Sequence, residues 1–203
     1  CDRRQRQMCI RDREEHGEYL FNAKRGFQIS SNWGVLENHG LLFIGLALGK
    51  EIYTETALKR LEQEVQIQIF SDGVHWEQSC MYHNEVLHCV LETIHMLQAW
   101  GRKIPEKITE AARRMAMVNV AWKKPDGCQP LTGDSDETNV EDMLAVSAIL
   151  LAKEGKKEAE VLKGCAGQYP DYESIWDLRR EGAEIYERIL GLSLIHISEP
   201  TRH

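Results

Sequence analysis

Apolar residues spaced three and four positions apart are the feature of this sequence that most constrains its fold. They recur in residues 58–69, in residues 87–97 and in residues 108–122, where Pro105 lies just before the series. One turn of an α-helix holds 3.6 residues, so this spacing places the apolar side chains on one face of a helix. Each segment is therefore predicted to be an amphipathic helix with one buried face.

Three further segments extend the helical pattern. Residues 140–151 are apolar on more than one face, which predicts a deeply packed helix, and residues 35–48 are also strongly apolar and predicted to be helical. Asp171 is a good N-cap for a last helix over residues 171–189. Strand-like alternation is confined to VQIQIF at residues 65–70, which we expect to form the C-terminal end of a helix. The sequence thus predicts an all-α fold.

The composition is that of an ordinary globular chain. Of its 203 residues 42% are hydrophobic, and 25 Lys and Arg stand against 32 Asp and Glu, which gives a net charge of -7. This acidic balance argues against binding to duplex DNA or to an anionic membrane surface, so no nucleic-acid partner is expected. No apolar run reaches the roughly 18 residues of a transmembrane helix, so no membrane span is expected.

Both ends of the chain resemble translated sequencing adapters. Residues 3–13 read RRQRQMCIRDR and residues 192–202 read LSLIHISEPTR, and both strings back-translate to adapter sequences. Such foreign segments are excluded from fold reasoning in the way that expression tags are. We therefore expect residues 1–13 and 192–203 to be artefacts and residues 14–191 to be an internal piece of a longer gene. The alternative is a basic N-terminal arm and an amphipathic tail.

The cysteines between the two ends show no metal-binding or redox spacing. Cys80, Cys89, Cys128 and Cys165 contain no CxxC pair, which indicates neither a zinc ribbon nor a thioredoxin motif. A chain with so apolar a core needs no disulfides, so free thiols are expected. Free thiols favour a reducing compartment such as the cytoplasm.

Two segments concentrate polar and aromatic residues. Residues 72–85 read DGVHWEQSCMYHNE between two predicted helices, and residues 30–38 read SSNWGVLEN at the start of another. A helix N-terminus offers unpaired N–H groups that suit a substrate carboxylate. Elimination next to a carboxylate needs one group that neutralises the carboxylate and another that moves the proton. Amides, imidazoles and a phenol, all present here, are suited to those tasks.

Each of these residues also has a structural interpretation. Trp33, Trp76 and Tyr82 are of the type that packs between helices. His83 could be a hydrogen-bonded structural histidine, and Glu77 could cap a helix or pair with an arginine.

The acidic loop GDSD has a structural interpretation too. Asp134 and Asp136 precede residues 140–151 and could form only the N-terminal turn of that helix.

A metal site is the weaker chemical alternative. His88, Glu92 and His95 fall at i, i+4 and i+7 on one helical face, a spacing that can hold zinc. No HExxH arrangement accompanies them, and such a row is commonly the partly exposed side of an amphipathic helix. We expect no metal.

Taken together, the two polar segments resemble the N-terminal catalytic domain of the heparinase II/III family of polysaccharide lyases. The resemblance rests on SSNWGVLENHGLLFIGLAL at 30–48, ALKRLEQEVQIQIFSDGVHWEQSCMYHNEVLHCVL at 57–91, PDG at 125–127 and GDSD at 133–136. It implies an incomplete (α/α) toroid of antiparallel helix pairs, followed in the full-length protein by a C-terminal β-sandwich domain. It also implies a periplasmic or secreted enzyme that acts on an anionic polysaccharide or oligosaccharide without a cofactor.

The resemblance further implies β-elimination at C5 of a uronic acid, in glycans of the heparin, heparan sulfate or alginate type. Asn32 matches the asparagine that neutralises the substrate carboxylate. Tyr82 matches the tyrosine that acts as base and then as acid toward the glycosidic oxygen. Trp33 stands where some members have a histidine. Because an ordinary tyrosine has a pKa near 10, Tyr82 as a base would need a nearby cation or imidazole to stabilise its phenolate.

The remaining predicted site residues build the pocket around this pair. His83 is predicted to be catalytic, and four residues are predicted to bind substrate: Trp33, Glu37, Trp76 and Glu77. A further catalytic histidine or tyrosine is expected beyond residue 191, so the fragment alone is expected to be inactive. The competing interpretation is a non-catalytic α-helical glycan-binding or interaction module, which would have no reason to place Asn32 and Tyr82 in one pocket.

The charge of the expected biological segment is awkward for a polyanionic substrate. Residues 14–191 are more acidic than the whole chain, since most of the excluded charged residues are arginines. Local cations would have to offset this charge, and the candidates are Lys24, Arg25, Lys123 and Lys124.

Overall fold

The helices of the chain account for almost all of its regular structure. The computed structural model describes residues 3–23, 26–166, 181–182, 184–186 and 188–189. Its helices are α1 (Arg3–Asn22), the short 3-10 helix η1 (Phe27–Ser30), α2 (Asn32–Leu48), α3 (Glu51–Gln68), α4 (Cys80–Ala99), α5 (Glu106–Trp122), α6 (Glu141–Lys153) and α7 (Glu158–Ala166). Two isolated bridges are the only β-pairing among the described residues. The predicted all-α fold is confirmed.

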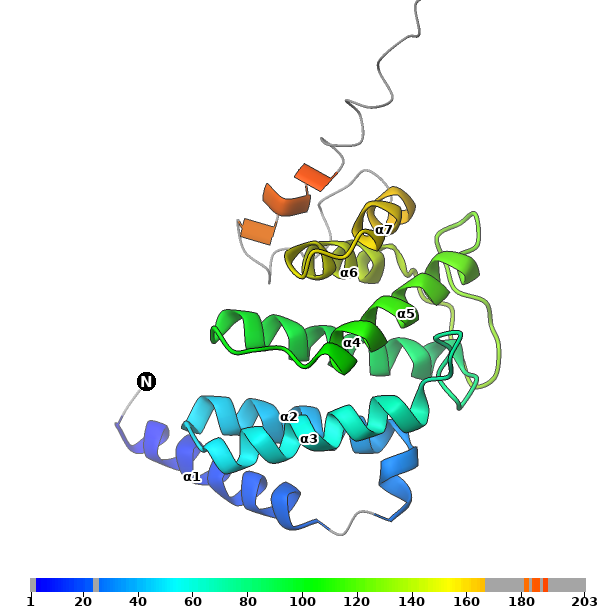
Figure 1. Cartoon of the computed structure of the whole chain (residues 1–203). Helices are drawn as coiled ribbons and strands as arrows, with labels where there is room; N and C mark the ends of the chain where they lie inside the picture. The colour runs from blue at the N-terminus through cyan, green and yellow to red at the C-terminus, as the bar shows by residue number, and fades with distance from the viewer. Residues whose placement is uncertain (1–2, 24–25, 167–180, 183, 187, 190–203) are drawn as a thin grey trace, which may run out of the picture.

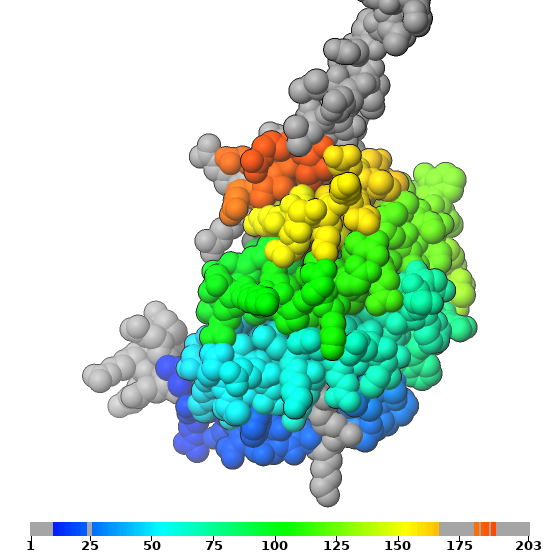
Figure 2. Space-filling model, in the orientation of Figure 1, coloured from blue at the N-terminus to red at the C-terminus, as the bar shows by residue number. Residues whose placement is uncertain are grey.

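The helices stack as antiparallel pairs in two rows (Figure 1). Helices α2 and α3, α4 and α5, and α6 and α7 form the pairs. Helix α4 contacts both α2 and α6 in one row, and α5 contacts both α3 and α7 in the other. Figure 2 shows the same order on the surface, from the blue N-terminal layer to the yellow and orange C-terminal layer. A toroid of helix pairs uses two such rows for its inner and outer helices.

The core lies where the predicted apolar stripes meet. Leu61 and Val65 of α3, Leu91 and Ile94 of α4, and Met115 of α5 are each at most 1% exposed. Helix α6 is buried on several faces, as its nearly continuous apolar sequence predicts. None of the described helices combines the length and apolar content that crossing a membrane requires.

Several element boundaries differ from the sequence-based expectation. Helix α2 begins at Asn32 rather than residue 35, because Ser31 caps it. Helices α1 and α7 are not predicted from the sequence, since neither carries a long apolar stripe at helical spacing. The last predicted helix, residues 171–189, falls largely outside the described residues, and those described within it are helical.

The long connections between helices lie together at one end of the stack. Short turns join α2 to α3, α4 to α5, and α6 to α7, whereas residues 69–79 and 123–140 form long connections from α3 to α4 and from α5 to α6. Because paired helices are antiparallel, the two long connections lie at the same end of the stack, where α2 and α4 begin (Figure 1). Helix η1 joins them there, so polar segments far apart in sequence meet at one end.

Two glycines of α2 give a matched test of this packing. A methyl group at Gly34 would overlap the Gln28 carbonyl oxygen and lie 2.6 Å from Glu64 Oε1, whereas at Gly40 it would lie 3.6 Å from Leu20 Cδ1, an ordinary contact. We expect Gly34→Ala to lower the free energy of unfolding by about 2 kcal/mol through overpacking. Gly40→Ala should raise it by about 0.5–1 kcal/mol, because alanine favours the helix. Urea unfolding measures both, and equal effects would contradict the close approach of η1 to α2.

Candidate active site

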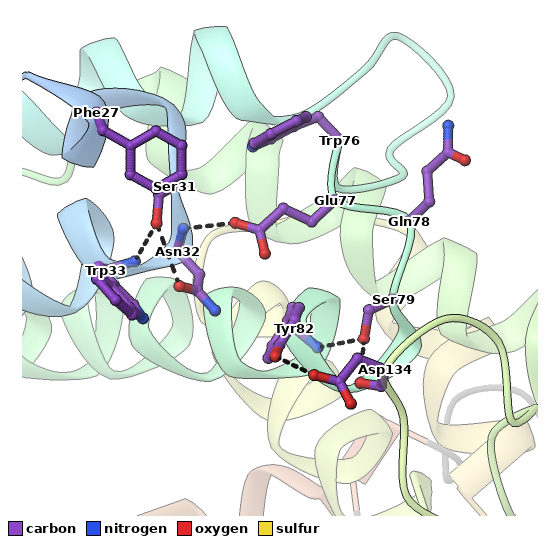
Figure 3. Close-up of a pocket in the computed structure, with 10 residues that line it drawn as sticks. All are labelled: Phe27, Ser31, Asn32, Trp33, Trp76, Glu77, Gln78, Ser79, Tyr82 and Asp134. Atoms are coloured by element: carbon purple, nitrogen blue, oxygen red, sulfur yellow. Dashed lines mark hydrogen bonds between the residues drawn. The ribbon is translucent and has the colours of Figure 1, made fainter.

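A pocket of about 490 Å³ opens where η1, the starts of α2 and α4, and the two long connections meet (Figure 3). The residues that line it are Phe27, Ser31, Asn32, Trp33, Trp76, Glu77, Gln78, Ser79, Tyr82 and Asp134. The two polar segments found in the sequence therefore meet in one pocket. Of the seven predicted site residues, five line it: Asn32, Trp33, Trp76, Glu77 and Tyr82.

The N-terminus of α2 is closed by side chains of the pocket. Ser31 Oγ accepts a hydrogen bond from the Trp33 N–H at 3.2 Å, and Glu77 Oε1 accepts one from the Asn32 N–H at 3.0 Å. Glu77 is thus a helix cap, the structural alternative noted from the sequence, and its charge is stabilised by the helix dipole. The prediction that unpaired N–H groups of this helix receive a substrate carboxylate is wrong for these two amides, because both are occupied.

The side-chain amide of Asn32 remains available to a ligand. Asn32 is only 7% exposed, and its Oδ1 lies 3.5 Å from Ser31 Oγ. Among the described residues no group accepts a hydrogen bond from its Nδ2, which lines the same pocket as the Tyr82 ring (Figure 3). The pocket therefore holds an N–H donor that is nearly buried and faces the space a ligand would fill.

Tyr82 lies in the first turn of α4, next to a carboxylate of the α5–α6 connection. Its N–H is capped by Ser79 Oγ at 3.3 Å, and its hydroxyl donates to Asp134 Oδ2 at 2.5 Å (Figure 3). The hydrogen bond to Asp134 and the charge of that group raise the pKa of Tyr82, with smaller contributions from burial and from Glu77. This is the opposite of the cation or imidazole that a phenolate base would need.

Exposed aromatic rings form the rim of the pocket. Trp33 is 62% exposed, Phe27 65% and Trp76 37%. Figure 3 shows Phe27 and Trp76 on the side of the pocket away from Tyr82. The alternative that Trp33 packs between helices is therefore wrong, because most of its ring lies in solvent.

Two predicted site residues lie outside the pocket. His83 is fully buried beneath it, so the prediction that it acts directly on a substrate is corrected: its ring is enclosed by the protein. The centroid of its ring lies 4.8 Å from that of Trp122 on α5, with the two rings tilted by 58°. Glu37 lies one turn further along α2 than the pocket lining and is half-buried. Asn38, also within the first polar segment, is buried and donates to Glu64 at 2.9 Å.

Buried polar side chains support the pocket from behind. Gln68 Nε2, at the end of α3, donates to the carbonyls of Ile29 and Ser31 at 3.1 and 2.9 Å. Gln68 Oε1 lies 2.9 Å from His75 Nε2 in the α3–α4 connection. Because a carbonyl oxygen only accepts, His75 must carry its proton on Nε2. One carboxamide thus joins η1, α3 and the loop that carries Trp76.

The same row of hydrogen bonds continues through His83 into α5. The backbone N–H of His75 donates to His83 Nδ1 at 3.4 Å. The ring proton of His83 is therefore on Nε2, which donates to the Met115 carbonyl at 3.1 Å. Burial lowers the pKa of both histidines to about 4. Both imidazoles are therefore neutral at pH 7, and they position the pocket from behind it.

The loop between α5 and α6 supplies the pocket residue that the sequence argument missed. Asp134 is not part of the N-terminal turn of α6, because that helix begins at Glu141. The loop is fastened to the start of α4: Ser79 Oγ donates to the Asp134 carbonyl at 2.8 Å, and the Met81 N–H donates to Ser135 Oγ at 3.1 Å. The GDSD string was the available signal, but only the folded chain brings it to Tyr82.

Of the four cations expected to offset the acidic charge, the two that the structure describes lie outside the pocket lining. Lys123 pairs with Glu141 at 2.9 Å, and Lys124 lies 3.1 Å from both Asp126 and Glu137. Lys24 and Arg25 fall outside the described residues. The described lining of the pocket thus contains no lysine or arginine.

In the row His88, Glu92 and His95, the carboxylate is paired with histidines. Glu92 Oε2 lies 3.0 Å from His39 Nε2 of α2 and 3.5 Å from His88 Nε2, and the hydrogen bond with His39 is the largest cause that lowers the pKa of Glu92. The four described cysteines are free thiols, of which Cys80 and Cys89 are buried.

Comparison with known proteins gives the family. The model of the family described as Heparinase II/III N-terminus matches residues 7–152, which is most of the chain. The chain belongs to the heparinase II/III family. The resemblance found from the sequence is thereby confirmed, while no curated protein and no solved structure matches the chain. All described residues of the candidate pocket fall within the heparinase II/III match. The match also includes residues 7–13, and the predicted adapter boundary stays a prediction.

The neutral histidines predict how stability depends on pH. In the unfolded chain both titrate near 6.5, whereas in the folded chain burial holds their pKa at about 4. Between these values the unfolded state binds protons that the folded state excludes, so stability falls as the pH drops from about 6.5 to 4. At about pH 5 we expect the free energy of unfolding, measured with urea, to be lower by about 2 kcal/mol per histidine than at neutral pH.

A glutamine at position 75 tests the source of this effect. His75→Gln keeps a side-chain N–H but cannot be protonated, so its unfolding free energy should depend less on pH than that of the unsubstituted protein. Measurements above about pH 5 leave carboxylates ionised and isolate the histidines. An unchanged pH dependence in this variant would contradict the buried neutral state of His75.

Proposed function

We propose that this chain contributes the catalytic pocket of a polysaccharide lyase that cleaves uronic-acid-containing anionic glycans by β-elimination. The observation that carries the proposal is that Asn32 Nδ2 and the Tyr82 hydroxyl line one pocket, although the two residues come from different helices. Membership in the heparinase II/III family supports it independently. Asn32 and Tyr82 are also the two residues that match the family's carboxylate-neutralising and proton-transferring groups.

Asn32 has the chemistry needed to lower the barrier to proton removal. The C5 proton of a uronate is weakly acidic, because the neighbouring carboxylate already carries a charge that opposes a carbanion. A donor that binds this carboxylate in a nearly buried site stabilises the charge that develops on it in the transition state. Asn32 is 7% exposed and its Nδ2 faces the pocket, so it is the donor proposed for this role.

Tyr82 is proposed to transfer the proton. Tyr82 lines the same pocket as Asn32, its hydroxyl donates to Asp134, and its backbone N–H donates to Ser79 Oγ. A group that removes the C5 proton and then protonates the leaving oxygen on the same side of the sugar must reach both atoms, and a tyrosine oxygen is suited to both.

The aromatic rim is proposed to bind the sugar rings. Trp33, Phe27 and Trp76 present exposed faces beside the polar groups, and sugar rings stack on such faces through their C–H bonds. With no lysine or arginine in the described lining, stacking and neutral hydrogen bonds would supply much of the affinity. The same rim is the observation that favours the alternative, a non-catalytic glycan-binding module.

Removal of the Tyr82 hydroxyl tests the enzymatic proposal. In the full-length protein, Tyr82→Phe should abolish formation of the ultraviolet-absorbing unsaturated sugar from heparan sulfate, alginate or other uronates. Loss of a general acid–base group lowers the rate by about 10²–10⁴-fold. Binding of the oligosaccharide, followed by calorimetry, should persist. Near-normal turnover by the variant would contradict the role of Tyr82, and binding without turnover by the unsubstituted protein would favour the binding module.

Removal of the Trp33 ring tests the sugar platform. Trp33→Ala should raise KM about tenfold with a smaller change in kcat, because stacking binds substrate and transition state alike. Trp100→Ala is the matched control: Trp100 is 49% exposed but lies at the other end of α4, next to the short connection. The control should leave KM unchanged. Equal effects of the two substitutions would exclude a specific platform at Trp33.

A further inference from the structure

Asp134 is the one charged group that contacts the proposed proton-transferring atom. Its Oδ2 lies 2.5 Å from the Tyr82 hydroxyl, which donates to it. The other carboxylate of the pocket, Glu77, already accepts the Asn32 N–H. No comparable contact with the hydroxyl is made by any other charged side chain among the described residues.

The backbone around Asp134 is held in place by the start of the helix that carries Tyr82. Ser79 Oγ lies 2.8 Å from the Asp134 carbonyl and 3.0 Å from Ser135 Oγ, and Ser135 Oγ donates to the Thr132 carbonyl at 2.6 Å. Gly133 has φ +66 and packs so closely that a methyl group there would lie 3.3 Å from Ser79 Cα. Tyr82 and Asp134 are therefore anchored to the same residue, Ser79.

The hydrogen bond creates a difficulty for a simple phenolate base. Asp134 and Glu77 are the charged groups that face Tyr82, and both raise the pKa of its phenol above the ordinary value near 10. At pH 7 fewer than about one phenol in a thousand would then be ionised. If Tyr82 had to lose its hydroxyl proton to solvent before the reaction, the active phenolate would be almost absent at pH 7. The hydroxyl proton therefore needs another acceptor during the reaction.

We propose that Asp134 is that acceptor and holds the Tyr82 hydroxyl proton while the tyrosine oxygen removes the C5 proton of the substrate. This inference rests on the proposed lyase function. Asp134 acts through Tyr82 and does not itself need to touch the sugar, so it is a positioning and proton-holding residue.

The proposed step is balanced without any further reactant. The C5–H bond breaks and its proton moves to Tyr82 Oη, while the original hydroxyl proton moves to Asp134 Oδ2. The electron pair of the C5–H bond forms the C4–C5 double bond, and the C4–O bond breaks. Tyr82 then gives its proton to the leaving oxygen and recovers the proton held by Asp134. Both residues end as they began, and the C5 proton has moved to the leaving group.

The substitution Asp134→Asn separates uptake of the proton from the hydrogen bond that positions Tyr82. Asp134→Asn still accepts the Tyr82 hydrogen bond but cannot take up the proton. In the full-length protein we expect kcat at about pH 7 to fall roughly 100-fold with little change in KM. Because the substitution also removes a charge that opposes ionisation of Tyr82, the lost activity should return as the pH approaches about 10, where the phenolate forms unaided. Asp134→Glu should restore part of the rate at neutral pH.

Asp136→Asn is the matched control on the same loop. Asp136 is exposed and lies outside the pocket lining, so its substitution removes an equal charge and should leave kcat unchanged. Circular dichroism and thermal unfolding establish that all variants are folded.

Two outcomes would overturn the role of Asp134. The first is that kcat of Asp134→Asn equals that of the unsubstituted enzyme at neutral pH. The second is that kcat of Asp134→Asn falls by the same factor at every pH while KM rises. If the unsubstituted full-length protein forms no unsaturated product from any uronate glycan, the proposed function itself fails, and this result is distinct from both.

Discussion

The hydrogen bond between the buried side chains of Gln68 and His75 is the interaction on which the pocket depends. The same Gln68 carboxamide donates to two backbone carbonyls in and just after η1, so three segments meet at one side chain. Both residues are fully buried, and water cannot replace the partners they provide. Each of these polar groups would cost about 1–3 kcal/mol if it stayed buried without its partner, so the three segments are held in one mutual arrangement.

Through His83 the same network fixes the wall that carries the pocket residues. The loop from Ile69 to Ser79 is bonded at His75 to α3 on one side and to α4 on the other. Between His75 and Ser79 the chain passes through Gln78 at φ 55, a left-handed conformation that few residues other than glycine adopt. Such strain persists only where the surroundings over-determine it, and here the histidines on one side and the Ser79 cap on the other do so.

The sequence predicts the helices better than it predicts the site, for a physical reason. Helical spacing of apolar residues is a local signal, so α3, α4, α5 and α6 are all found from it. The pairing of Tyr82 with Asp134 joins residues 52 positions apart and depends on how the α5–α6 connection folds back onto α4. His83 shows the complementary limit: its position in a polar segment suggested catalysis, but burial, which residue type alone does not reveal, makes it a support.

The acidic character of the chain poses less of an obstacle to an anionic ligand than its net charge suggests. Each carboxylate of the pocket already has a donor: Glu77 receives the first N–H of α2 together with the positive end of its dipole, and Asp134 receives the Tyr82 hydroxyl. A carboxylate that already accepts a hydrogen bond from the protein repels an anionic ligand less than a carboxylate without a donor does. Asn32 Nδ2 is one neutral donor in the described lining, and a donor in a nearly buried place gains strength from the low local dielectric. For the proposed anionic substrate, neutral donors and the aromatic rim would therefore contribute more to binding than long-range attraction.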